Sequence, residues 1–233
     1  MSTRTAAALV ALLAVISSAA VPAFAQRAET RRVEEAATVF KAVVSDPGHQ
    51  VPDALIKNAY AIAIVPGVRR IGFVVGGQRG SGVLLVRGKD AQGWEGPVFV
   101  RLAGASVGWQ IGIQSADIVL FFRTKESVRG VLGGKFTLGV GASIAAGSVG
   151  RQAGAVTDED LGAEIYSYSR TRGVFAGVTL EGASIEVEPG ANAAYYGRDI
   201  GQPLDFLEGA RLPAPPSAAA LRQAVATYEK SLK

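Results

Sequence analysis

Apolar residues recur every three to four positions near both ends of the chain, which is the period of an amphipathic helix. The first such segment covers residues 27 to 45, carries Glu34 and Glu35 opposite its apolar stripe, and ends at Asp46-Pro47-Gly48. The last covers Ser217 to Leu232, after a Pro213–Pro216 linker. The two apolar stripes are Val33, Ala36, Ala37, Phe40, Val43 and Val44 in the first helix, and Leu221, Val225, Tyr228 and Leu232 in the last.

Between residues 61 and 188 the pattern changes to alternation of apolar and polar or small residues, which is typical of half-buried strands. We expect Ala61–Val65 to be a buried strand that ends at Pro66-Gly67, and Gly76–Gly80 to be a hairpin connection. The other predicted strands are Arg70–Val75, Gly82–Arg87, Val98–Leu102, Gly104–Gln114, Ile118–Phe122 and Lys135–Ala145. Two shorter helices are predicted, from Pro52 to Ala59 and from a Thr124 cap to Gly133-Gly134.

Several of these strands have one apolar face and one face of Gly, Ser, Thr and Gln. In Gly104–Gln114, Val107, Trp109, Ile111 and Ile113 alternate with small or amide residues. Because glycine inside a strand costs stability, its repetition needs a cause. Either another segment packs very close to this face, or the face lines a groove.

These elements predict an α+β fold with a strongly coiled, mainly antiparallel sheet, open or closing toward a barrel, and a helix packed on it at each end of the chain. Residues 1–25 have the pattern of a secretory signal peptide: Arg4, an apolar run, and Ala23-Phe24-Ala25 as a cleavage site. A membrane anchor is the alternative. We therefore expect residues 26–233 to form one domain of a periplasmic or secreted protein. Without cysteine, it contains no disulfide, lipid-modified cysteine or thiolate metal site.

Charge is unevenly distributed along the chain. Residues 57–151 hold twelve basic and four acidic residues, and residues 158–208 hold ten acidic and three basic ones. Such asymmetry favours attraction to an anionic surface by one side of the molecule. Alternatively, strands of the two segments interleave and their charges mix.

The residues do not indicate an enzyme. The single histidine, His49, lies in a predicted turn, and no G-x-S-x-G motif is present. The glycine-rich Gly76–Gly82 matches neither phosphate-loop nor dinucleotide patterns, although a backbone nest for one phosphate remains open. Thr157–Asp160 is typical of a helix start rather than a calcium loop. We expect no cofactor, no metal and no nucleic acid partner.

The segment Ile165–Gly182 predicts two short strands around the turn Arg170–Gly173. It offers hydroxyls, aromatics and two arginines, which suits contact with an apolar and anionic partner. Arg170 and Arg172 are candidates for holding lipid head groups, and Phe175 for touching acyl chains. Further candidates are Arg69, Arg70 and Arg79.

Four ordered motifs resemble the SYLF domain family over about residues 28–230. They are VPGVRRIGFVVGGQRGSG (65–82), PVFVRLAGASVGWQIG (97–112), AAGSVGR (145–151) and SYSRTRGVFAGVTLEG (167–182), followed by Asn192 and Tyr195-Tyr196-Gly197. The resemblance implies phospholipid binding without enzymatic activity, and actin binding in some fungal members. It also implies a membrane-binding N-terminal helix. Here that helix mixes Arg27, Arg31, Arg32 and Lys41 with Glu29, Glu34 and Glu35.

We therefore predict an exported protein that binds anionic phospholipid peripherally through a basic surface. One alternative is a non-catalytic envelope protein that binds a protein partner through its glycine-lined face. Another is a carrier of lipid in an internal cavity, which requires several hundred Å³ of apolar space.

Overall fold

The computed structural model describes residues 25–45, 51–89, 93–146, 162–171, 174–175, 180–213 and 215–232, and of residues 71–75, 106–114, 171 and 174–175 only the backbone. The predicted signal peptide, His49 and Thr157–Asp160 lie outside these residues. The helices are an N-terminal helix (residues 25–44), α2 (Asp53–Lys57), α3 (Lys125–Leu132), α4 (Pro189–Tyr196), the 3-10 helix η4 (Pro203–Glu208) and α5 (Pro216–Ser231). The strands are β1 (Ala61–Arg87), β2 (Trp94–Phe122), β3 (Lys135–Thr137), β4 (Ile144–Ala146), β5 (Ile165–Thr171), β6 (Val174–Phe175) and β7 (Ser184–Val187).

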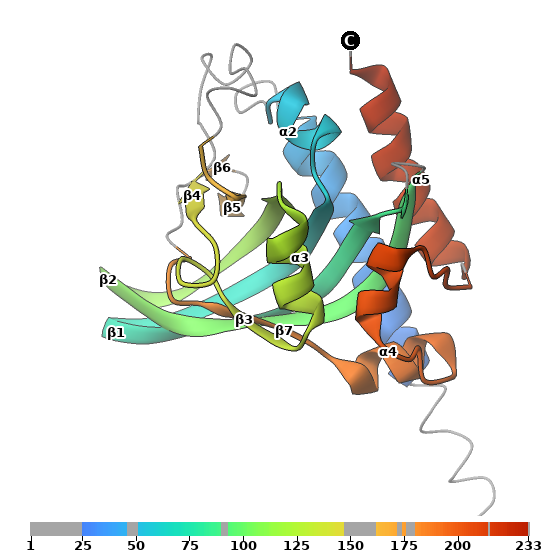
Figure 1. Ribbon diagram of the computed structural model, residues 1–233. Helices are drawn as coiled ribbons and strands as arrows, with labels where there is room; N and C mark the ends of the chain where they lie inside the picture. The colour runs from blue at the N-terminus through green and yellow to red at the C-terminus, as the bar shows by residue number, and fades with distance from the viewer. Residues whose placement is uncertain are drawn as a thin grey trace, which may run out of the picture.

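The described strands form one strongly curled sheet with helices on both faces (Figure 1). The order is β3-β7-β2-β5-β4, with β1 paired to β2 and β6 to β5. Each of these pairs is antiparallel except β4 with β5. The predicted α+β fold, with a mainly antiparallel coiled sheet and helices at both ends, is therefore confirmed.

Alternation along the strands gives the sheet two buried faces. Ile62 and Ile64 belong to a core beneath the N-terminal helix, α2 and α5, whereas Ala61, Ala63 and Val65 belong to a core beneath α3 and η4. The predicted apolar stripes of the first and last helices both pack against the first of these cores. The sheet is thus the middle of three layers, and its strands are apolar on both sides because both sides are covered.

β1 and β2 are longer than the sequence pattern predicts. β1 neither ends at Pro66-Gly67 nor turns at Gly76–Gly80, but pairs with β2 from Ala61↔Phe122 to Arg87↔Trp94. Pro66 and Gly67 fall in a register shift between Val65 and Val68, where no ladder partner is needed, and Gly67 has φ +57°. A bulge absorbs both residues without ending the strand.

β1 also folds back beside itself. The Arg87 amide donates to the Tyr60 carbonyl at 2.8 Å, so residues 60–65 and 82–87 lie next to each other. A Cβ added at Gly82 would lie 2.2 Å from the Ile64 carbonyl oxygen, and one at Gly104 would lie 2.8 Å from Ala183 Cα. Of the two explanations for the glycine-rich faces, close packing therefore holds at these positions.

The predicted single strand Lys135–Ala145 is wrong, because the segment divides into β3 and β4 around a turn. Gly139 has φ +80°, a left-handed conformation that suits glycine and interrupts the strand. Leu138 and Ala142 still enter the core, whereas Val140 is 81% exposed. Alternation alone did not distinguish this turn from a strand.

The helix ends were predicted more accurately than the strand ends. The Thr124 side chain accepts a hydrogen bond from the Ser127 amide, and Gly133 follows the last turn of α3. The β5–β6 hairpin is also confirmed, but Arg170 lies opposite Phe175 and Thr171 opposite Val174, so these two residues belong to the ladder and not to the predicted turn. The turn residues 172–173 lie outside the description.

Candidate functional site

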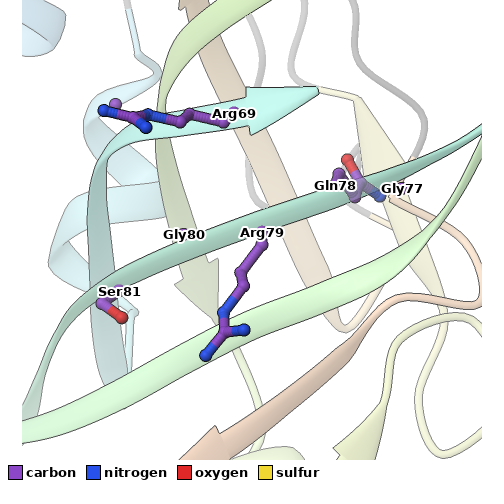
Figure 2. A pocket seen from close by; sticks show the side chains of 7 residues that line it. Arg69, Gly77, Gln78, Arg79, Gly80 and Ser81 are labelled. Carbon is purple, nitrogen blue, oxygen red and sulfur yellow. The ribbon is translucent and has the colours of Figure 1, made fainter. Parts of the chain in front are cut away.

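Two of the predicted arginines lie together on one surface. Arg69 and Arg79 are exposed and line a hollow of about 510 Å³, together with Gly67, Gly77, Gln78, Gly80 and Ser81; we call it the basic hollow. Figure 2 shows that they come from two limbs of β1 and that their guanidinium groups point in different directions. Neither forms an ion pair with a described residue. The hollow therefore offers two separate positive charges rather than one bidentate clamp.

The fold of β1 creates this hollow. Gly80 packs so closely that an added Cβ would lie 2.6 Å from Val68 Cγ2, whereas a Cβ at Gly77 would meet nothing within 4 Å. Backbone and small residues thus line much of the hollow, together with the side chains of the two arginines. Arg69 and Arg79 are ten positions apart in the sequence, so no local pattern indicated that they share a site.

Arg70 does not share the exposed position of Arg69. It is half-buried, and its Nε donates to Oε1 of the buried Gln78 at 3.2 Å. Burial lowers the pKa of the Arg70 guanidinium below its usual value. Neighbouring strand residues face opposite sides of a sheet, so the Arg70 side chain lies on the other face from Arg69, and Arg70 does not line the basic hollow.

Arg170 lies farther along the sheet, on β5, opposite Asp117 of β2. It is half-buried, and no described residue accepts a hydrogen bond from its Nε. The Asp117 carboxylate accepts a hydrogen bond from the Gly67 amide at 2.9 Å, so it stands between Arg170 and the basic hollow. Arg172 and the Phe175 side chain are outside the described structure, and their predicted roles stay predictions.

A second hollow, of about 560 Å³, adjoins the first at Gly67. The N-terminal helix contributes Arg31, Glu34, Glu35, Thr38 and Val39 to its lining, and the sheet contributes Pro66, Gly67 and Asp117. We call it the acidic hollow, because three carboxylates face one guanidinium. The sequence placed Glu34 and Glu35 on the polar face of a helix, but it did not indicate which strand that face borders.

A third hollow, of about 610 Å³, lies where the C-terminal end of α3 meets β7 and the loop after α4. Its lining mixes Lys135, Glu186 and Asp199 with apolar residues. Asn192 borders it but serves the fold: its Oδ1 accepts from the Phe99 amide at 2.9 Å, and its Nδ2 donates to the Glu188 carbonyl at 2.9 Å. Asn192 is therefore a buried residue that joins the backbone at Phe99 to the backbone at Glu188.

An ion cluster holds the N-terminal helix on the sheet. Arg32 contacts Glu188 at 2.8 Å and Glu29 at 3.1 Å, and Arg101 donates to the other oxygen of Glu188. Burial raises the pKa of the Glu29 carboxyl, while Arg32 opposes and Glu188 adds to the rise. Arg32 therefore stabilises the packing of this helix on the sheet, whereas Arg27, Arg31 and Lys41 are exposed.

The basic and acidic segments of the sequence interleave in the sheet. Arg101 pairs with Glu188, and Lys135 lies 3.5 Å from Glu186. The alternative in which charges of the two segments mix therefore applies at these strands.

No group of three or more histidine, cysteine or acidic side chains in the described residues is arranged to hold a metal ion. No described helix is both long and apolar enough to cross a membrane.

The comparisons with known proteins agree on one family. The profile of the family described as Ysc84, Las17-binding protein actin regulator, matches residues 103–228. Protein YSC84 of Saccharomyces cerevisiae is 35% identical over 171 residues, which are 72% of this chain and 36% of that protein. LAS seventeen-binding protein 3 of Saccharomyces cerevisiae is 36% identical over 150 residues, 63% of this chain and 32% of that protein.

A vertebrate relative shows the same similarity. SH3 domain-containing YSC84-like protein 1 of Xenopus laevis is 30% identical over 186 residues, 78% of this chain and 55% of that protein. The chain thus spans about a third to a half of the length of these relatives. Of these three relatives, one is named for a binding function and one for an SH3 domain, and none of the three names states a reaction. Profile and relatives together show that the chain belongs to the Ysc84 family, that of the SYLF domain.

Proposed function

We propose that this protein is a non-enzymatic, peripheral binder of anionic phospholipid surfaces. The observation that carries the proposal is the pair of exposed arginines, Arg69 and Arg79, at the base of a two-stranded extension of the sheet. This extension, the β1–β2 arm, comprises residues 69–79 and 104–114 and extends past the helices in Figure 1.

The composition of the arm supports contact with a bilayer. Its backbone register places Ile71 opposite Ile113 and Val75 opposite Val107. Between Arg69 and Arg79 the sequence is Arg-Ile-Gly-Phe-Val-Val-Gly-Gly-Gln, with a single charge. Apolar residues of such a segment gain free energy by entering the interface, while flanking arginines reach phosphate groups.

The two arginines set the size of the expected effect. Each basic residue near an anionic membrane surface contributes ~1 kcal/mol, so two contribute ~2 kcal/mol. Since 1.4 kcal/mol is tenfold in affinity, replacing both with glutamine weakens binding to anionic vesicles roughly 30-fold. The contribution falls with added salt, because salt screens exposed charges.

Flotation with vesicles tests this proposal. We expect the purified protein to bind phosphatidylcholine vesicles that contain phosphatidylglycerol better than vesicles of phosphatidylcholine alone. The variant Arg69→Gln with Arg79→Gln loses this preference. The matched control, Arg129→Gln with Arg198→Gln, removes the same charge from exposed positions at the end of α3 and just after α4, and it keeps the preference.

A second pair of variants tests the hairpin candidates. Arg170→Glu with Arg172→Glu weakens binding only if the β5–β6 hairpin also touches the membrane. Equal binding of neutral and anionic vesicles by the parent protein, with no effect of either arginine pair, would refute the proposal.

Export belongs to this proposal as well. Residues 1–25 have the pattern of a signal peptide, so we propose that the working protein begins near Gln26 and meets phospholipids of a cell envelope. Mass spectrometry of the protein from cell fractions tests this, and an intact N-terminus in the cytosolic fraction contradicts it.

A second candidate function is protein binding. The name of LAS seventeen-binding protein 3 and the description of the family favour it. In this case the chain acts as an interaction module without lipid selectivity. Vesicle binding that stays at the level of phosphatidylcholine, together with retention of a defined protein partner on the immobilised chain, favours this candidate over the first.

A further inference from the structure

The basic and acidic hollows adjoin at Gly67, and together we call them the charged groove. Gly67 lines both, so the positive charges of Arg69 and Arg79 lie on one side of it and the carboxylates of Glu34, Glu35 and Asp117 on the other. The acidic side includes one cation, Arg31. The two halves therefore carry formal charges of +2 and −2, and the groove is bipolar.

The two charged sides lie close together. Asp117 is fixed against the Gly67 amide at 2.9 Å. Arg69 follows Gly67 by two residues, which corresponds to about 7 Å along a strand. Glu34 and Glu35 approach the same glycine from the N-terminal helix, and both are exposed. A small group with charges of both signs can therefore reach both sides at once.

A purely anionic head group fits only half of this groove. Its phosphate is attracted by Arg69 and Arg79, but the nearby carboxylates repel it. A phosphate that bears a primary ammonium on a short linker satisfies both halves, because the ammonium donates hydrogen bonds to the carboxylates. A quaternary ammonium has no N–H and makes no such bonds, although its net charge is the same.

We propose that the groove at Gly67 selects the phosphoethanolamine head group of phosphatidylethanolamine over phosphocholine. The inference rests on the proposed function, because it adds a head-group-selective contact to the surface that binds anionic membranes. It assigns the phosphate to Arg69 and Arg79, and the ammonium to Asp117 with Glu34 and Glu35. The N-terminal helix then acts as one wall of the lipid site.

The experiment compares vesicles of equal net charge. We expect phosphatidylcholine vesicles with phosphatidylethanolamine to bind about tenfold better than phosphatidylcholine alone, the gain of one charge-assisted hydrogen bond. N-methylation removes donors step by step, so binding falls from phosphatidylethanolamine through its monomethyl and dimethyl forms. Vesicles of phosphatidylcholine with diacylglycerol control for altered lipid packing and bind like phosphatidylcholine alone.

Matched variants separate the two sides of the groove. Glu34→Gln with Glu35→Gln abolishes the ethanolamine preference but leaves binding to phosphatidylglycerol vesicles equal or stronger. The control, Glu126→Gln with Glu208→Gln, makes the same charge change at exposed positions of α3 and η4 and preserves the preference. Circular dichroism confirms that each variant keeps its fold before it is compared.

The outcomes also separate this inference from the proposed function. If phosphatidylglycerol vesicles bind but phosphatidylethanolamine gives no gain over phosphatidylcholine, the head-group inference fails and the proposed function stands. If neither lipid improves binding, both fail. A gain that the diacylglycerol vesicles reproduce, or that survives the Glu34 and Glu35 replacements, overturns the inference. Competition by glycerophosphoethanolamine without any vesicle preference identifies a soluble zwitterion as the ligand and overturns the lipid assignment.

Discussion

Replacing Gly82 with alanine tests the central packing feature of this fold. A methyl group at Gly82 would lie 2.2 Å from the Ile64 carbonyl oxygen and 2.7 Å from Val65 Cα. Real Cβ contacts are essentially never below 3.0 Å, so one limb of β1 has to move by about 0.8 Å from the other. The atoms that must move belong to the backbone, and Ile64 and Val65 are held in the ladder with β2. No rotation of a side chain relieves the contact.

The expected cost follows from these contacts. Overpacking costs about 1–3 kcal/mol, and each weakened hydrogen bond of the ladder adds about 0.5–1.5 kcal/mol. We expect Gly82→Ala to lower the free energy of unfolding by about 3 kcal/mol. For a domain of this size that corresponds to a fall in Tm of about 6–12 °C.

Gly77→Ala is the matched control, because it makes the same chemical change on the same strand in open space. It leaves the free energy of unfolding unchanged or raises it by up to about 1 kcal/mol, since alanine has less freedom in the unfolded chain. Thermal and urea unfolding followed by circular dichroism measure both variants. If Gly82→Ala lies within about 0.5 kcal/mol of Gly77→Ala, the two limbs do not pack as described and the reasoning is refuted.

Three further predictions concern the ion cluster, the buried amide and the basic hollow. Burial raises the pKa of Glu29 in the folded protein, so its ionisation opposes folding, and its contribution to stability falls as pH rises through that raised pKa. Glu29→Gln is therefore at least as stable as the parent near pH 7 and loses this advantage near pH 4. Unfolding in urea at both pH values measures the difference in free energy of unfolding between variant and parent. A variant that is less stable than the parent at pH 7, and more so than at pH 4, contradicts the prediction. Asn192→Ala leaves the Phe99 amide without its acceptor and costs about 1–3 kcal/mol, measured as a fall in Tm. Gly77→Glu places a carboxylate in the basic hollow from a position with free space, so it weakens binding to anionic vesicles while Tm stays within about 2 °C; unchanged binding would remove this hollow from the lipid site.

Local patterns predicted the N-terminal helix, α2, α3 and α5, because a helix satisfies its hydrogen bonds within itself, but they missed α4 and η4. The stripe from Val33 to Val44, the Thr124 cap and the apolar positions of α5 all appear in the structure. Strand ends were predicted less accurately, since a strand ends where its partner ends. Pro66-Gly67 and Gly76–Gly80 have the composition of turns, yet β2 continues beside them and keeps them in the ladder.

The candidate site was predicted only in part. The sequence identified Arg69 and Arg79 as candidates, and the structure places both in one hollow. It also included Arg70, which donates a hydrogen bond to Gln78 and does not line the hollow. Which of two adjacent arginines is exposed depends on the face that the core covers, and this is a long-range property. Nothing in the sequence indicated that Glu34 and Glu35 face Gly67.

The sequence by itself determined the family, the α+β class and the terminal helices, because motifs and periodicity are carried by neighbouring residues. Only the tertiary structure decided what the glycines do and where opposite charges meet. Gly82 is required because the second limb of β1 returns against Ile64, 18 positions earlier in the chain. The bipolar groove arises because the N-terminal helix lies beside Pro66 and Gly67 in the first limb of β1. Both features depend on contacts between segments far apart in sequence, which the fold of the whole sheet establishes.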